Sequence, residues 1–178
     1  MASFSILLFF AVTGITLNHQ DWFGGEPKVA RFAGTIDPAR INPSLAANVD
    51  QAPVVAQLRS AHGIKAALKD FRVDDDQIGV SFKGPGYAAD AFIDRKTGSY
   101  DMTETRMGAI AIINDLHKGR DSGNAWSLII DISAILMVIV SLTGFVLIFF
   151  LHKRLTLGLA VLGVGTLVCV AVYMFMVS

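Results

Sequence analysis

The sequence contains a single cysteine, Cys169, in 178 residues, which excludes an intramolecular disulfide. This cysteine lies within an apolar run, so it carries no information about the redox compartment. Charged residues are also scarce, at 17% of the chain, and the 15 Lys and Arg equal the 15 Asp and Glu in number. This balance excludes the basic surface that is typical of nucleic-acid-binding proteins, and no nucleic-acid partner is expected.

Sequence motifs of soluble enzymes are absent as well. There is no HExxH segment, no glycine-rich phosphate loop after a strand, no nucleotide-binding segment and no nucleophile elbow. Three consecutive acids, Asp74, Asp75 and Asp76, stand between two predicted strands, where a solvated hairpin turn is favoured over an acid–base pair. The chain is therefore not expected to be an autonomous enzyme.

Hydrophobic residues, by contrast, make up 53% of the sequence and gather in three long runs. A bilayer core of about 30 Å is crossed by roughly 20 apolar residues in a helix, and helices satisfy their own backbone groups where water is absent. The sequence therefore predicts three transmembrane helices, at residues 1–18, 125–151 and 157–177, with a juxtamembrane turn at 118–124 and a short turn at 152–156.

The first apolar run could instead be a cleaved signal peptide, since its length permits either. No basic segment precedes the run, and no small-x-small cleavage site stands between it and the polar residues that begin at Asn18. An uncleaved anchor is therefore the favoured interpretation.

The basic residues Lys153 and Arg154 set the predicted orientation, because short loops that carry Lys and Arg stay on the cytoplasmic side. With the 152–156 turn inside, the segment between the first and second helices lies outside the cytoplasm. The sequence thus predicts a multi-pass α+β membrane protein with a small extracytoplasmic domain inserted between its first two transmembrane helices.

The inserted segment divides into a tether at 19–50 and a domain at 51–117. Helical spacing of apolar residues predicts a helix from about 53 to 63, and a second helix is expected near 107–117. Period-two alternation between turn signals predicts an antiparallel meander of four strands, near residues 66–73, 77–83, 87–94 and 99–105. The tether has no sustained period and has room for one short strand.

The order of these parts resembles the PepSY-associated transmembrane family. Residues 92–98, Phe-Ile-Asp-Arg-Lys-Thr-Gly, are similar to the hydrophobic-Asp-x-x-Thr-Gly turn of the PepSY domain. The segment from Thr13 to His19 resembles the end of the family's first helix, and Leu-His-x-Gly-Arg at 116–120, followed by Trp126, resembles the approach to its second. Family members usually carry a basic, histidine-containing stretch before the first helix, where this sequence has Met1.

The resemblance implies a bacterial inner-membrane protein with a periplasmic domain. Larger relatives are reductases of ferric iron or ferric siderophores that move electrons through haem b. The resemblance therefore implies a haem b bound by His19 and His117, because imidazoles from facing helices are common axial ligands of haem iron. The alternative is that His19 is a polar interface residue beside Trp22 and that His117 lies at the surface of a charged turn.

Two further residues are weaker candidates. Asp131 lies roughly 7 Å deeper than Trp126 at 1.5 Å per residue, where an unpaired acid is costly. It could orient a ligand imidazole, accept a proton, or simply reach the headgroups or bond Ser127 or Ser133. His152 is expected to belong to the cytoplasmic turn rather than to a ligand pair.

Two classes of function remain open from sequence. In one, the chain is a haem-binding electron-transfer subunit or accessory that serves ferric reduction and requires a protein partner or a second copy. In the other, it is a non-catalytic module whose PepSY-like domain binds a periplasmic protein such as a peptidase, while the helices anchor it in the membrane.

Overall fold

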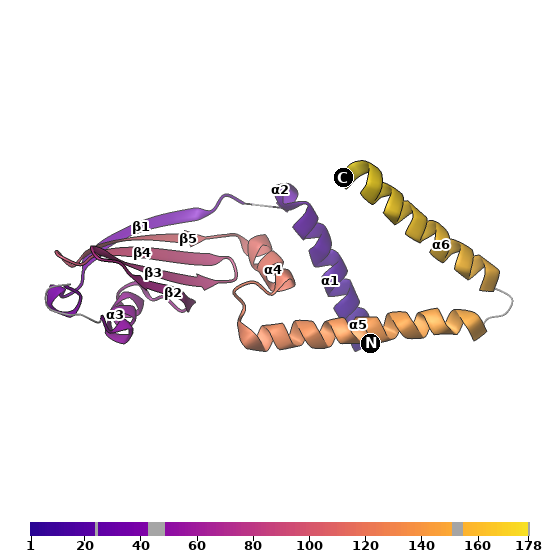
Figure 1. The fold of residues 1–178 in the computed structure, drawn as a ribbon, viewed down its shortest axis with the longest axis horizontal. Coiled ribbons are helices and arrows are strands. Elements are labelled where there is room, and N and C mark those ends of the chain that lie inside the picture. The colour runs from indigo at the N-terminus through magenta and orange to yellow at the C-terminus, as the bar shows by residue number, and fades with distance from the viewer. Residues whose placement is uncertain (24, 43–48, 151–154, 178) are drawn as a thin grey trace. The chain divides into compact units, whose positions relative to one another are not determined.

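The computed structural model describes residues 1–178 except 24, 43–48, 151–154 and 178 (Figure 1). The chain divides into two compact units. The first, called here the domain unit, is Leu8–Ile130; the second, the apolar unit, joins Met1–Leu7 to Asp131–Ser178. The predicted turn at 152–156, with His152, Lys153 and Arg154, falls largely outside the described residues.

In the domain unit, helix α3 (Gln51–His62) has ends that are set by local chemistry. Asp50 caps its first turn, where the carboxylate accepts a bond of 3.0 Å from the Ala52 N–H. The helix stops at Gly63, which has φ +66° and adopts the left-handed conformation that glycine tolerates best. The prediction of a helix from 53 to 63 thus matches the structure within two residues at its start.

A five-stranded antiparallel sheet covers one side of α3. The order in the sheet is β1-β5-β4-β3-β2. The strands are β1 (Lys28–Thr35), β2 (Ala67–Val73), β3 (Gln77–Gly84), β4 (Tyr87–Asp94) and β5 (Ser99–Arg106). Alternate residues of β3, β4 and β5 face α3, so the hydrophobic core lies between helix and sheet; its fully buried members include Val54, Leu58, Ile78, Val80, Phe82, Ile93 and Met102.

The sheet has one strand more than the predicted four-stranded meander. Lys28–Thr35, predicted as tether, pairs along its whole length with β5. Seven of its eight residues are exposed, because β1 is an edge strand held by backbone bonds rather than by burial of alternate side chains. A strand of this kind leaves no period-two hydrophobic signal in the sequence.

The remaining helices are largely apolar. They are α1 (Ala2–Asn18), the short α2 (Gln20–Phe23), α4 (Ala109–Lys118), α5 (Gly123–Phe150) and α6 (Leu155–Val172), which continues as a π-helical turn, Tyr173–Val177. Among the described residues, two helices are long and apolar enough to cross a membrane, Gly123–Phe150 and Leu155–Met176, whereas the apolar part of α1 is shorter. The third crossing, by α1, stays a prediction.

The turn between β4 and β5 gives a pH dependence that can be tested. Asp94 accepts hydrogen bonds from the backbone N–H of Thr97 at 2.8 Å and of Lys96 at 2.9 Å, and from the Thr97 hydroxyl at 3.0 Å. These bonds lower the pKa of Asp94 below its ordinary value, and the bond from the Thr97 backbone N–H has the largest effect. The folded state therefore binds this proton less readily than the unfolded state does.

We expect the contribution of Asp94 to be fully present above its unfolded pKa of about 4 and to disappear as pH falls through the lower folded value. Thermal unfolding of the domain, followed by circular dichroism between pH 6 and pH 3, measures this. The midpoint of Asp94→Ala should fall less on acidification than that of the wild type, and parallel curves for the two proteins would refute the role given to this turn.

Candidate functional site

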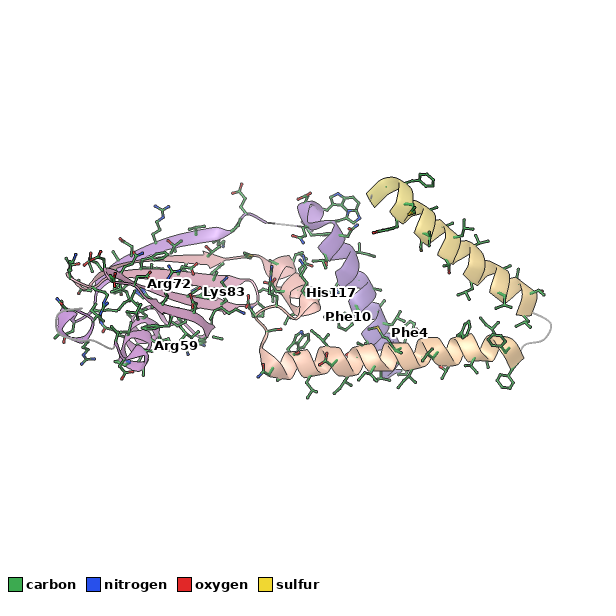
Figure 2. All side chains as sticks on the ribbon, in the orientation of Figure 1. Phe4, Phe10, Arg59, Arg72, Lys83 and His117 are labelled. Carbon is green, nitrogen blue, oxygen red and sulfur yellow. The ribbon has the colours of Figure 1, made fainter. Side chains whose placement is uncertain are left out.

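His117 lies in the last turn of α4, where that helix meets α1. α4 is amphipathic and ends at Gly119, whose φ of +67° and backbone N–H bonds to Asp115 and Leu116 carbonyls close the helix. The Nδ1 atom of His117 is 2.6 Å from the hydroxyl oxygen of Thr13, and its ring centroid is 5.2 Å from that of Phe10 (Figure 2). His117 is therefore held against α1 as a half-buried side chain.

The hydroxyl hydrogen of Thr13 is already used within α1. Thr13 Oγ1 donates to the carbonyl oxygen of Phe9 at 2.7 Å, the i−4 bond that threonine often makes in a helix. A hydroxyl has one hydrogen, so the ring of His117 has to supply the other. His117 Nδ1–H thus donates to Thr13, and Nε2 has no hydrogen-bond partner in the part of the chain that the structure describes.

Gly14 lets the imidazole approach the backbone of α1. A Cβ atom at this position would be 3.8 Å from Cε1 of His117, an ordinary van der Waals contact, so the ring lies directly beside Gly14. The imidazole of His117 therefore lies against Thr13 and Gly14 of α1.

His19 lies just beyond the end of α1. Its ring stacks on Trp22, with centroids 3.9 Å apart and planes inclined by 14°. His19 is six residues beyond Thr13, a rise of about 9 Å along a helix, and the contacts of His117 are with Phe10 and Thr13. The structure thus places one predicted ligand beside the middle of α1 and the other at its end, stacked against an aromatic ring.

The other predicted site residues are placed as follows. Asp131 lies in the apolar unit, with an exposed side chain on α5. Its roles as an orienting carboxylate or proton acceptor remain predictions, and His152 lies outside the described residues. In the described ranges, no group of three or more His, Cys, Asp and Glu side chains is arranged to hold a metal ion.

His62, at the end of α3, is half-buried against the edge of the sheet. Its Nε2 atom is 2.8 Å from the hydroxyl oxygen of Tyr100, and its ring packs at 5.0 Å from that of Phe32. This contact joins the end of α3 to β1 and β5, which gives His62 a structural role in the domain.

Two buried polar residues next to His117 were not identified from sequence. Asn114 is 6% exposed, and its amide oxygen accepts a bond from the Thr16 hydroxyl at 3.1 Å. Asp115 is 7% exposed and accepts bonds from Gly86 and Arg120. Asp115 and Arg120 are five residues apart, which is not a helical spacing. They meet because the left-handed Gly119 turns the chain before Arg120, so no sequence period marks the pair.

A second polar cluster lies where β4 begins and β5 ends. Glu104 is buried and forms an ion pair with Arg106. Burial raises the pKa of Tyr87, and the neighbouring carboxylate of Glu104 raises it further. Because the guanidinium of Arg106 is 5.9 Å from the Tyr87 ring centre, the three side chains satisfy one another and form a structural cluster.

Comparison with known proteins identifies the family. No curated protein and no solved structure matches the chain. One family model, described as PepSY_TM-like, matches residues 1–178, the whole chain. The match confirms the resemblance that the Asp-x-x-Thr-Gly turn and the two helix ends suggested, and two helices of sufficient length agree with a membrane protein. The chain belongs to the PepSY_TM-like family of membrane-associated PepSY proteins.

Proposed function

We propose that this protein is a haem b-binding electron-transfer subunit or accessory for the reduction of ferric iron or ferric siderophores. It would lie in the bacterial inner membrane as a multi-pass protein with its PepSY-like domain in the periplasm. The observation that carries the proposal is the hydrogen bonding of His117, whose Nδ1–H is held by Thr13 and whose Nε2 has no hydrogen-bond partner among the described residues. A histidine that binds a metal generally has its other ring nitrogen held in this way.

The residues present fit one axial ligand well. Thr13 selects the tautomer of His117, Phe10 contacts the edge of the ring, and Gly14 leaves room beside it. When bound, a b-type haem would take up and release single electrons. The role of the protein is to hold one imidazole in a fixed orientation beside an apolar helix, where burial and hydrogen bonding tune such a group.

Binding of haem iron by a second ligand requires a conformational change or another chain. His19 is the second ligand in this proposal, and its stack on Trp22 would have to open for the ring to turn. A second copy of the chain or a protein partner would otherwise supply the ligand. A partner is needed in either case, because one cofactor near the outer face cannot pass electrons across about 30 Å of bilayer alone.

A second candidate function is that of a binding module, and one observation favours it. Phe92 alternates with the buried residues of β4, so it lies on the face of the sheet opposite α3, where it is 53% exposed. On this proposal the PepSY-like domain contacts a periplasmic protein such as a peptidase, and the apolar helices serve as its anchor.

Optical spectra of histidine variants distinguish the two functions. We expect the purified protein, produced with haem supplied, to show b-type bands on reduction with dithionite, and we expect His117→Ala to lose most of them. His62→Ala is the matched control, because His62 is also a half-buried histidine with one hydrogen-bond partner. It should keep the bands.

The behaviour of His19→Ala then assigns the second ligand. Loss of haem in this variant supports the His19–His117 pair, whereas retention assigns the second ligand to another chain. Thr13→Val removes the bond to Nδ1 and should keep the haem but alter its reduction potential. Equal haem content in the wild type and His117→Ala, or none in either, would overturn the redox proposal and leave the binding module.

A further inference from the structure

The two edge strands of the sheet, β1 and β2, differ in how far they are protected from pairing with a further strand (Figure 1). β2 is interrupted by a β-bulge between Leu68 and Asp70, and its Lys69 forms an ion pair of 2.9 Å with Asp121. Bulges and charged side chains are features that keep an edge from pairing. β1 has no proline, and its pairing with β5 is regular over all eight residues, so it has no bulge either.

Alternate residues of β1 direct their backbone groups away from β5. In an antiparallel pair, every second residue bonds the neighbouring strand through its N–H and C=O, and the residues between them point outward. The Ile36 N–H donates to the Gly98 carbonyl at 2.7 Å, so the even-numbered residues of β1 bond β5. The N–H and C=O groups of Val29, Arg31 and Ala33 therefore point to the outer edge, where no further strand lies in the described part of the chain.

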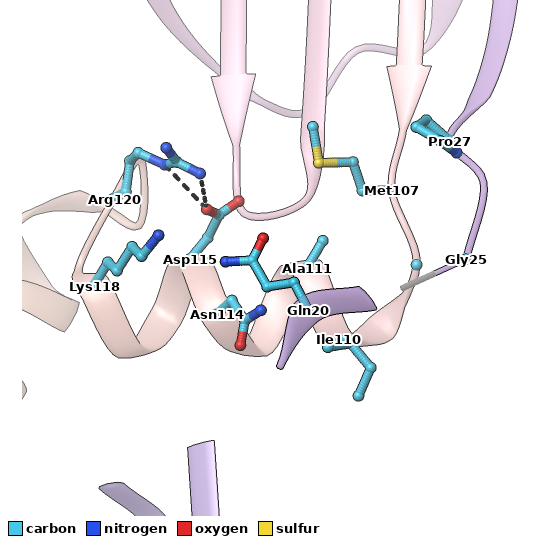
Figure 3. Close-up of a pocket in the computed structure, with 11 residues that line it drawn as sticks. Gln20, Gly25, Pro27, Met107, Ile110, Ala111, Asn114, Asp115, Lys118 and Arg120 are labelled. Carbon is cyan, nitrogen blue, oxygen red and sulfur yellow. Dashed lines mark hydrogen bonds and ion pairs between the residues drawn. The ribbon is translucent and has the colours of Figure 1, made fainter. Parts of the chain in front are cut away.

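Two features mark the ends of this open edge. Pro27 lies at the entrance to β1, also at an odd-numbered position, and has no N–H to donate (Figure 3). At the other end, the Gln57 side-chain amide donates to the Thr35 carbonyl at 3.1 Å, as expected for an odd-numbered residue whose carbonyl points away from β5. The open edge thus begins after Pro27 and ends at Thr35.

The side chains of β1 define the kind of strand that fits beside it. On the face that carries α3, the exposed ring of Phe32 lies between the small residues Ala30 and Gly34, so a neighbouring strand can pack apolar side chains on either side of the ring. On the other face, Arg31 is exposed and forms no ion pair among the described residues. An acidic residue opposite Arg31 would supply the complementary charge.

From these observations we propose that β1 binds an extended, acidic segment of another protein as a sixth, antiparallel strand of the sheet. Backbone hydrogen bonds to Val29, Arg31 and Ala33 hold the segment, and its alternating side chains contact Phe32 and Arg31. A second copy of β1 fits this edge less well, because β1 contains two cations, Lys28 and Arg31, and no acid. The inference is independent of haem and rests on the binding-module function, for which it identifies the surface and the partner.

A fluorescein-labelled peptide, Thr-Ile-Thr-Val-Glu-Ile-Thr-Glu, tests this inference. It is designed to run antiparallel to β1, with its fifth residue, a glutamate, opposite Arg31. Fluorescence anisotropy measures its binding to the full-length protein in detergent. The N–H groups of its odd-numbered residues would bond β1, whereas those of its even-numbered residues would face solvent.

Methylation of the peptide's backbone nitrogens distinguishes strand addition from other modes of binding. We expect methyl groups on the third and fifth residues to lower the affinity about tenfold, because two hydrogen bonds are lost. Methyl groups on the fourth and sixth residues should leave the affinity nearly unchanged. The protein is the wild type in both measurements, so its folding does not affect the comparison.

Charge reversal tests the acidic character of the partner. Arg31→Glu should weaken binding of the peptide several-fold and should bind a peptide with lysine as its fifth residue more tightly than the wild type does. The matched control is Arg72→Glu, which changes an exposed arginine on the other edge strand, where it pairs with Asp74. This control should bind the original peptide as the wild type does.

The outcomes separate this inference from the proposed functions. His117→Ala should bind the peptide as the wild type does, whatever its haem content. Absence of binding to the wild type would overturn the inference. Equal affinity of the two methylated peptides would also overturn it, and would leave the binding module to another surface. Self-association of the wild type that the peptide blocks, measured by analytical ultracentrifugation, would overturn the assignment to another protein in favour of a second copy.

Discussion

Gly98→Ala is expected to destabilise the domain by about 3 kcal/mol, since a left-handed alanine costs ~1–2 kcal/mol and overpacking ~1–3 kcal/mol. Gly98 has φ +73° in the turn between β4 and β5. A Cβ atom there would lie 2.1 Å from the carbonyl oxygen of Ile36 and 3.1 Å from Pro38. The Gly98 carbonyl also accepts the Ile36 N–H at 2.7 Å, so moving the turn away would break the end of the β1–β5 pair.

Hydrogen exchange of the strand amides in the full-length protein measures this loss. Gly63→Ala is a matched control, because Gly63 has nearly the same φ, +66°, but open space around its Cβ position. It should lose only about 1 kcal/mol, the cost of the left-handed conformation. If the two variants exchange alike, then the close contact with Ile36 does not hold this turn in place.

The second large effect is expected for Asp115→Ala, at about 3 kcal/mol. Asp115 joins α4 to the β3–β4 turn, because its carboxylate accepts the buried Gly86 N–H at 2.9 Å and two N–H groups of Arg120. Its removal forfeits charged hydrogen bonds that contribute about 1.5–3 kcal/mol and leaves the Gly86 N–H without an acceptor, which costs about 1–3 kcal/mol. Arg120 is exposed and can return to water, which reduces the total.

Exchange at the β3–β4 turn and along α4 should rise together in Asp115→Ala, while exchange in β1 should change little. Asp101→Ala, which removes an exposed acid on β5, is the control and should leave both regions as they are in the wild type. Unchanged protection of α4 in Asp115→Ala would show that the helix is held to the domain by other contacts.

The sequence predicted most of the domain because its periodic elements bury one face. Strands β3 to β5 alternate between the core and the opposite face, and α3 begins and ends at residues with a clear capping role, Asp50 and Gly63. For β1 the sequence indicated only that the tether has room for one short strand, because this edge strand is held by backbone bonds to β5, with few of its side chains buried.

The sequence suggested His117 as a candidate ligand, a role that stays a prediction, and it gave no sign of the contact between His117 and Thr13. The contact between His117 and Thr13 joins residues 104 positions apart, and no local period reports it. The left-handed Gly119 and Gly123 interrupt the chain between His117 and α5, so the face of α4 could not be extrapolated from the apolar helix that follows. For the same reason the sequence did not distinguish Asn114 and Asp115 from ordinary polar residues of a charged turn.

The most direct test of the central proposal is the absorption spectrum of the wild-type protein, purified in detergent after expression with haem supplied. The account predicts sharp b-type bands on reduction, with haem bound in a fixed ratio to the chain. The account would be contradicted if the protein is colourless and stays colourless when a basic, histidine-containing stretch of the family type is added before Met1.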